Sequence, residues 1–107
     1  MVEKDTHDNV EPGFVISPKI LDKLDVKHGV TREEVIQCFY NKNNEDDLID
    51  NREQNRTMPP TLWFLAETNC GRLLKIVYVF REDNSTFYVK SAYEPNSTEI
   101  HIFNKYS

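Results

Sequence analysis

Three apolar segments joined by two short polar turns constrain this 107-residue chain more than any other feature. The segments cover residues 61–68, 72–81 and 85–93, and their side chains alternate between two faces in the manner of β-strands. Turns this short connect antiparallel neighbours, because a parallel crossover needs about a dozen residues or more. The sequence therefore predicts an antiparallel sheet at the centre of the fold.

Two helices are expected before the sheet. Ser17 can cap free backbone amides and Pro18 fits the first helical turn, so a helix is predicted to begin there. Gly29 can adopt a left-handed backbone and is expected to end it. The Thr-Arg-Glu-Glu sequence at 31–34 is a capping box, which predicts a second helix that ends near Asn41.

The weaker signals complete the expected fold. The apolar run at 14–16 predicts a short strand or a plug against the core, and residues 48–52 are a candidate further strand. Asn96 or Ser97, followed by Glu99, predicts the start of a last helix. The expected class is α+β, with two N-terminal helices, an antiparallel sheet of three to four strands and a C-terminal helix.

Composition fits one domain. Residues 14–107 are expected to form it, after a disordered tail at 1–13 that is polar, acidic and aperiodic. An aromatic content of 11% supports one modest core, whereas a net charge of −5 argues against broad nonspecific binding of nucleic acid. No apolar stretch approaches the roughly 20 residues of a membrane span.

Cellular location is inferred from the cysteines and from the start of the chain. Cys38 and Cys70 occur without the apolar core of a secretion signal, so both are interpreted as free thiols in a reducing cytosol. The chain is therefore expected to be cytoplasmic. No zinc-type Cys or His spacing and no glycine-rich phosphate loop is present, so neither a metal nor a cofactor is expected.

Charge is distributed unevenly along the chain. Residues 1–50 carry twelve acidic and six basic side chains, a balance of −6, whereas 51–107 carry six acidic and seven basic ones, a balance of +1. Cationic groups therefore concentrate where the sheet is predicted. A local basic patch would suit an anionic ligand, an RNA or a protein partner, and the alternative is that these charges only solvate exposed faces.

Four residues are candidates for RNA cleavage without a metal, a reaction that needs a base, cations around the phosphate and an acid. His28 has a near-neutral unperturbed pKa suited to proton transfer, Arg72 is a candidate phosphate clamp, and Tyr93 can stack on a base or donate a proton. Lys90 is expected near Lys75 if the last two segments pair. The structural alternatives are a helix-end histidine, a turn salt bridge and a rim aromatic.

Short motifs carry a family resemblance. The chain reads Lys-His-Gly-Val at 27–30, Gly-Arg-Leu-Leu at 71–74 and Ser-Ala-Tyr at 91–93. In these places it resembles the BrnT branch of the RelE-type toxin superfamily, over roughly residues 20–106. The resemblance implies an endoribonuclease that inhibits translation, with RNA as substrate and a DNA-binding antitoxin protein as partner, so that DNA is reached only through that partner.

A second resemblance covers residues 59–75 and 92–96. These segments are similar to short bacterial proteins that carry an ADP-ribosyl-(dinitrogen reductase) hydrolase label.

Toxins of the BrnT branch tend to place several arginines directly after Ser-Ala, where this chain has Tyr93, Glu94 and Pro95. That departure favours an alternative function, a noncatalytic protein-interaction module on the same fold.

A helix-turn-helix for DNA is a third interpretation, built on the two predicted helices. Its candidate recognition helix contains Arg32, Glu33, Glu34 and Gln37 and has little positive charge, which disfavours binding to DNA.

Overall fold

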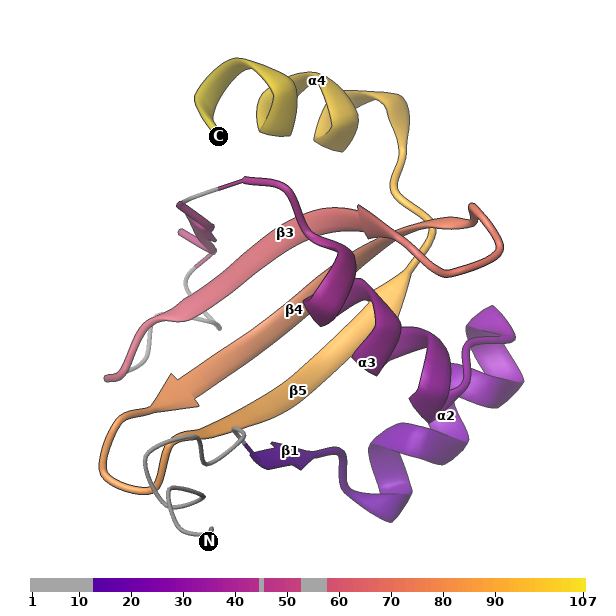
Figure 1. Ribbon diagram of the computed structural model, residues 1–107, viewed down its shortest axis with the longest axis vertical. Coiled ribbons are helices and arrows are strands. Elements are labelled where there is room, and N and C mark those ends of the chain that lie inside the picture. The colour runs from indigo at the N-terminus through magenta and orange to yellow at the C-terminus, as the bar shows by residue number, and fades with distance from the viewer. Residues whose placement is uncertain (1–12, 45, 53–57) are drawn as a thin grey trace, which may run out of the picture.

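The computed structural model describes residues 13–44, 46–52 and 58–107, and within them one twisted sheet carries helices on both of its faces (Figure 1). The strands are ordered β1-β5-β4-β3-β2 across the sheet. The elements follow one another as β1 (Gly13–Val15), α2 (Pro18–His28), α3 (Arg32–Asn41), β2 (Leu48–Ile49), β3 (Thr61–Glu67), β4 (Leu73–Arg81), β5 (Thr86–Tyr93) and α4 (Ser97–Tyr106). No helix in this part of the chain is long and apolar enough to cross a membrane.

The α+β class agrees with the sequence prediction, but the sheet differs from it. It is mixed rather than antiparallel, because β1 pairs in parallel with β5, with Phe14 opposite Phe87. It also has five strands, since β2 adds an antiparallel edge beside β3. A three-residue apolar run does not reveal its partner in the sequence. Most of the predicted tail, 1–12, lies outside the described residues, and Gly13 belongs to β1.

The helix boundaries follow the capping residues. The Ser17 hydroxyl accepts a hydrogen bond from the backbone amide of Ile20 at 3.2 Å, and Gly29 ends α2 with a φ of 62°. Reciprocal capping boxes open the other two helices, between Thr31 and Glu34 in α3 and between Asn96 and Glu99 in α4. These local hydrogen bonds explain why the sequence predicted the helix starts correctly.

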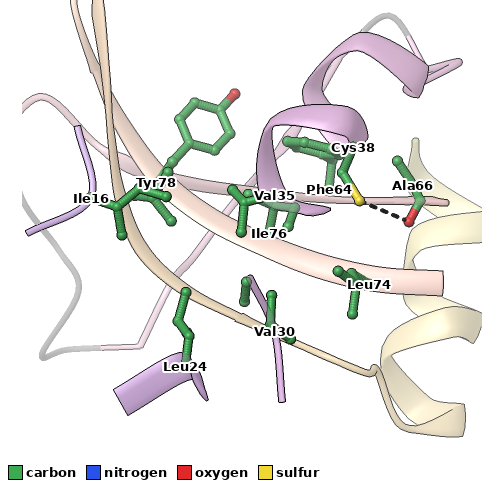
Figure 2. Close-up of a cluster of buried hydrophobic side chains, with 12 residues drawn as sticks. Ile16, Leu24, Val30, Val35, Cys38, Phe64, Ala66, Leu74, Ile76 and Tyr78 are labelled. Atoms are coloured by element: carbon green, nitrogen blue, oxygen red, sulfur yellow. Dashed lines mark hydrogen bonds between the residues drawn. The ribbon is translucent and has the colours of Figure 1, made fainter. Parts of the chain in front are cut away.

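Helices α2 and α3 cover one face of the sheet and enclose the main core (Figures 1 and 2). Leu24 of α2 and Val35 of α3 are completely buried against strand side chains that include Phe64 and Ile76. Burying each large apolar side chain stabilises the fold by about 1.5–3 kcal/mol. Packing on this face therefore fixes α2 and α3 to the sheet.

The opposite face is only partly covered. Helix α4 packs there through Ile100 and Phe103 against a smaller cluster of Trp63, Leu65 and Val77, and none of its own residues is buried. Part of this face is consequently left uncovered beside the helix, and the candidate site lies there.

A β-bulge in β5 changes which side chains share this second face. Val89 lies opposite Tyr78 and Ser91 lies opposite Val77, so Lys90 is the extra residue between them. The bulge places Tyr93 opposite Lys75, where the register of Tyr78 with Val89 would by itself have placed Ala92. Lys90 was expected near Lys75, but it lies beside Val77 and Tyr78, three positions before the residue that pairs with Lys75. The register of two paired strands is not determined by side-chain alternation alone.

Candidate functional site

A buried lysine marks the centre of the candidate site. Lys75 stands in the middle of the sheet on β4 and is only 5% exposed. Its Nζ lies 4.4 Å from the centroid of the Trp63 ring and 5.5 Å from that of Tyr93. An ammonium group is rarely buried without a charged partner, so the structure must supply a carboxylate here.

Glu99, in the first turn of α4, is that carboxylate. Its Oε2 accepts a hydrogen bond from Lys75 Nζ at 2.6 Å and one from the Tyr93 hydroxyl at 3.2 Å. Its Oε1 accepts the backbone amide of Asn96 at 3.0 Å, in the capping box of the helix. The cap therefore fixes the carboxylate so that one oxygen faces the sheet.

The ionisation of Glu99 reflects these contacts. Burial by itself raises the pKa of Glu99, but the hydrogen bonds from Lys75, Asn96 and Tyr93 and the charge of Lys75 outweigh it, so the pKa lies below its ordinary value. Glu99 is therefore ionised at neutral pH and able to accept a proton.

Arg52 brings a second cation to the same place. Its guanidinium makes two hydrogen bonds to the Asp50 carboxylate, of 3.1 Å from Nε and 2.8 Å from Nη2, and its side chain stays 54% exposed. These bonds raise the pKa of Arg52, and the negative charge of Glu99 adds to the effect. Arg52 is thus paired with a carboxylate two positions away in the chain, and it also interacts electrostatically with Glu99.

The loop before β2 is held by the side chain of Asp47, which is 4% exposed. Asp47 accepts hydrogen bonds from Lys42 at 2.6 Å and Asn44 at 2.7 Å, and a short one from the Tyr78 hydroxyl. Burial and this carboxylate raise the pKa of Tyr78. Because β2 pairs at only two positions, these bonds help to place the segment that leads to Arg52.

We refer to Arg52, Trp63, Lys75, Tyr93 and Glu99 as the Lys75 cluster. A pocket of about 680 Å³ opens over it, between α4 and the segment around β2. The pocket is lined by both charged and apolar residues: Asp47, Leu48, Ile49, Asp50, Asn51, Arg52, Trp63, Lys75, Glu99, Ile102 and Tyr106. A carboxylate, an ammonium and a guanidinium thus converge on one concave surface.

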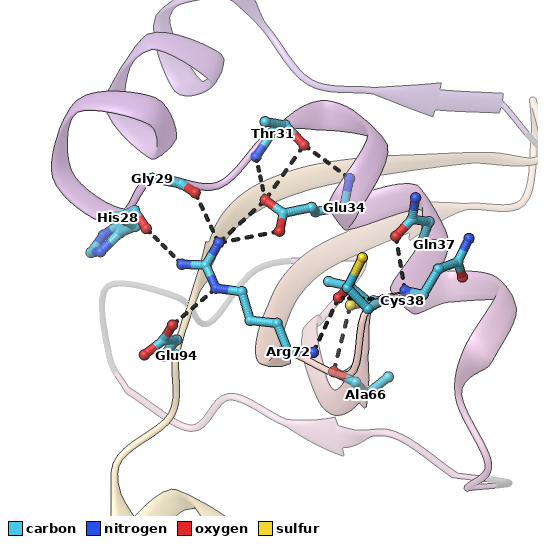
Figure 3. A network of polar contacts seen from close by, with 12 residues as sticks. His28, Gly29, Thr31, Glu34, Gln37, Cys38, Ala66, Arg72 and Glu94 are labelled. Atoms are coloured by element: carbon cyan, nitrogen blue, oxygen red, sulfur yellow. Dashed lines mark hydrogen bonds and ion pairs between the residues drawn. The ribbon is translucent and has the colours of Figure 1, made fainter.

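Arg72, a predicted site residue, joins structural elements instead of facing this pocket (Figure 3). Its guanidinium donates to the carbonyl oxygens of His28 at 2.9 Å and Gly29 at 2.8 Å, and to the carboxylates of Glu34 and Glu94. The hydrogen bond to Glu94 raises the pKa of Arg72 most, and the hydrogen bond to Glu34 raises it further. The guanidinium therefore ties the α2–α3 turn to the ends of β4 and β5.

His28 and Tyr93 lie next to each other, with ring centroids 5.4 Å apart. Together with Lys27, Arg72 and Glu94 they line a smaller pocket of about 320 Å³. Tyr93 also reaches Glu99, so it is the one residue of the predicted set that belongs to the Lys75 cluster. Lys90 lines neither this pocket nor the one over Lys75.

Sequence reasoning missed most of the cluster. Lys75 was expected only to lie near Lys90, and Glu99 was recognised only as a helix cap. One signal was available for Lys75, a charged residue inside the most apolar of the three predicted strands. A lysine at such a position requires a partner carboxylate, although the sequence does not say which one.

Among the described residues, no group of three or more His, Cys, Asp or Glu side chains is placed to hold a metal ion. Comparison with protein-family models and with curated protein sequences gives no significant match.

Proposed function

We propose that this chain is a metal-independent endoribonuclease, acting as the toxin of a bacterial toxin–antitoxin pair, and that its active site is the Lys75 cluster. The contact that carries the proposal is the 2.6 Å hydrogen bond between Lys75 and Glu99 beneath an open pocket. It sets a proton acceptor and a proton donor side by side, and Arg52 adds a fixed positive charge at the same pocket. RNA cleavage without a metal needs these three groups.

In the proposed reaction the Glu99 carboxylate takes the proton of a ribose 2′-hydroxyl. The 2′-oxygen attacks the adjacent phosphorus, a new P–O bond forms, and the bond from phosphorus to the 5′-oxygen breaks. Arg52 stabilises the negative charge that builds on the phosphate, and the Lys75 ammonium gives its proton to the leaving 5′-oxygen. The products are a 2′,3′-cyclic phosphate and a 5′-hydroxyl end.

The same contact restores the starting state. After cleavage Glu99 is protonated and Lys75 is a neutral amine, and their atoms are within direct hydrogen-bond distance. A proton passing from carboxyl to amine regenerates both groups without another residue. Tyr93 acts as a positioning residue in this scheme, because its hydroxyl donates to the reacting oxygen of Glu99.

The test is cleavage of a mixed-sequence RNA by the purified chain with excess EDTA. We expect 2′,3′-cyclic phosphate ends in the wild type and a rate loss of about 10²–10⁴-fold in Glu99→Gln. Gln retains the capping box, so the helix start is preserved. His101→Gln is the matched control, since this exposed residue on α4 lines neither of the pockets described above.

Inducible expression provides a second readout of the same proposal. Wild type should arrest growth, and co-expression of an antitoxin encoded beside it should restore growth. Wild-type chain that neither cleaves RNA nor slows growth would rule the proposal out. Equal rates of cleavage in wild type and Glu99→Gln would show that the chain is a ribonuclease but that the Lys75 cluster is not its active site.

A noncatalytic protein-interaction module is the second candidate, and one observation favours it. Three large apolar residues that line the pocket are exposed, namely Ile49 at 56%, Ile102 at 37% and Tyr106 at 65%. Clustered exposed apolar side chains are typical of protein contacts. A chain of this function would bind a partner through these residues, and Glu99→Gln would leave growth and RNA unaffected.

A further inference from the structure

A second cavity lies on the other flank of α4. Glu99, Ile102 and Tyr106 of this helix line the pocket over Lys75, whereas Ile100, Phe103 and Asn104 line a cavity of about 780 Å³. The remaining walls come from the end of α3 and the loop after it, and from the end of β3, the start of β4 and the turn between them. The volume is in the range that holds a small organic molecule.

The lining of this cavity is rich in amides and nearly uncharged. Glu67 is its one charged residue, while five asparagines contribute side chains around an apolar floor that includes Leu65, Leu73 and Phe103. No cation is available among these residues to bind a phosphate. The lining instead suits a neutral ligand with a flat apolar surface and polar edges.

Two of the asparagines are fixed by a hydrogen-bond chain. Asn41 Nδ2 donates to the carbonyl oxygen of Glu67 at 3.0 Å and to Asn69 Oδ1 at 2.9 Å. Because a carbonyl oxygen can only accept, the first bond fixes which end of the Asn41 amide is the nitrogen, and the second then fixes Asn69. Both amide orientations therefore follow from the backbone.

These hydrogen bonds leave one side-chain acceptor of Asn41 and one side-chain donor of Asn69 unused. Asn41 Oδ1 and Asn69 Nδ2 have no hydrogen-bond partner among the residues that the structure describes, and both side chains line the cavity. Asn69 is also held through its backbone amide, which donates to Gln37 Oε1 at 2.9 Å. The pair thus offers one acceptor and one donor at the same cavity, and both amides are already held in place before a ligand arrives.

We propose that this cavity binds a nucleobase, with adenine as the best-matched form. The exocyclic amino group of adenine donates to Asn41 Oδ1, its adjacent ring nitrogen accepts from Asn69 Nδ2, and its face packs on the apolar floor. When proteins read DNA, a single asparagine amide accepts from the amino group of adenine and donates to its ring nitrogen. Here the same two kinds of hydrogen bond would come from two asparagines. The site is separate from the Lys75 cluster and does not depend on the proposed cleavage activity.

The experiment is a titration of ¹⁵N-labelled full-length chain with adenosine, followed by NMR. Saturable shifts of the Asn41 and Asn69 side-chain amides are expected. N6,N6-dimethyladenosine has lost the donor and should bind at least roughly tenfold more weakly, the factor that one lost hydrogen bond corresponds to. Methyl glucoside, a neutral ligand without a flat ring, should cause no saturable shift.

A nearly isosteric variant tests the donor. Asn69→Asp keeps the oxygen that accepts from Asn41 but removes the free N–H, so adenosine should bind roughly tenfold more weakly. Asn84→Asp makes the same chemical change in the β4–β5 turn and should leave the affinity within about twofold. Thermal unfolding of both variants checks that they fold.

Three results would overturn the assignment. They are no saturable shift with adenosine at about 10 mM, equal binding of the dimethylated form, or equal effects of the two Asp variants. None of these measurements involves RNA cleavage, so failure here is distinct from failure of the proposed ribonuclease.

Discussion

Lys75 and Glu99 form a 2.6 Å ion pair between β4 and the first turn of α4, although 24 positions separate them. Their side chains are 7% and 19% exposed, so the pair is largely removed from water. The contact attaches α4 to a sheet face on which that helix buries none of its own residues. It therefore has a structural role as well as the proposed chemical one.

The structural role can be measured with a double-mutant cycle. Lys75→Met and Glu99→Gln should each lower the free energy of unfolding, and the double variant should lose less than the sum of the two. We expect a coupling free energy of about 1–3 kcal/mol, because each single variant leaves one partner without its counter-charge. Urea unfolding of the four proteins provides the values, and strictly additive losses would contradict the geometry.

The lowered pKa of Glu99 predicts a pH dependence of stability. In the folded chain Glu99 has a pKa below its ordinary value of 4.5, so near and below that value it binds fewer protons than in the unfolded chain. Its contribution to the free energy of unfolding is therefore fully present above about pH 4.5. It is lost as the pH falls through the folded-state pKa. The stability difference between wild type and Glu99→Gln should therefore stay constant near neutral pH and shrink below about pH 4.5.

This dependence is measured by urea unfolding at a series of pH values. His101→Gln serves as the control for replacement of a polar side chain on the same helix. A difference that instead grew on acidification would show that the Glu99 pKa is raised, and it would remove the basis for an ionised base.

Arg72 should matter for folding more than for chemistry. Arg72→Met removes the donors to the carbonyls of His28 and Gly29, and we expect a loss of about 2 kcal/mol in the free energy of unfolding. Any RNA cleavage should change less than about threefold, since Arg72 does not line the pocket over Lys75. Arg81→Met is the control, because its ion pair with Asp83 is on the surface and should contribute nothing measurable.

The measurements are chemical unfolding and single-turnover cleavage on the same preparations. A large rate loss with unchanged stability in Arg72→Met would restore this residue as a catalytic candidate.

The two cysteines should differ sharply in reactivity. Burial, with a contribution from Glu34, raises the pKa of Cys38 to about 12, and its thiol donates to the Ala66 carbonyl oxygen at 3.5 Å. Cys70 is exposed in the turn after β3. Iodoacetamide at pH 8 should therefore modify one thiol in the native chain and both in urea, as followed by mass spectrometry of tryptic peptides. Native alkylation of Cys38 would show that α3 opens away from the sheet.

Local sequence signals were sufficient for the secondary structure. Ser17, Thr31 and Gly29 specified helix ends through hydrogen bonds and backbone angles that involve residues at most a few positions away. The three long strands followed from alternation and from turns too short for anything but antiparallel neighbours. Each of these signals is local in the chain, so the sequence alone carries it.

Contacts between distant segments did not follow from such local signals. Parallel pairing of β1 with β5 joins residues more than 70 positions apart, and the bulge at Lys90 shifts the register by one. Both depend on packing against the rest of the sheet, which no local pattern encodes.

By itself, the sequence determined that this protein is an α+β chain with two capped helices, a three-strand meander and a final helix. Only the tertiary structure decided which charged groups meet. In the folded chain Arg72 donates hydrogen bonds to backbone carbonyl oxygens, and Glu99 of α4 forms an ion pair with Lys75. A buried cation such as Lys75 needs a carboxylate partner, and only the fold determines which carboxylate lies close enough. That choice depends on how α4 crosses the sheet, a relationship between segments that are distant in the chain.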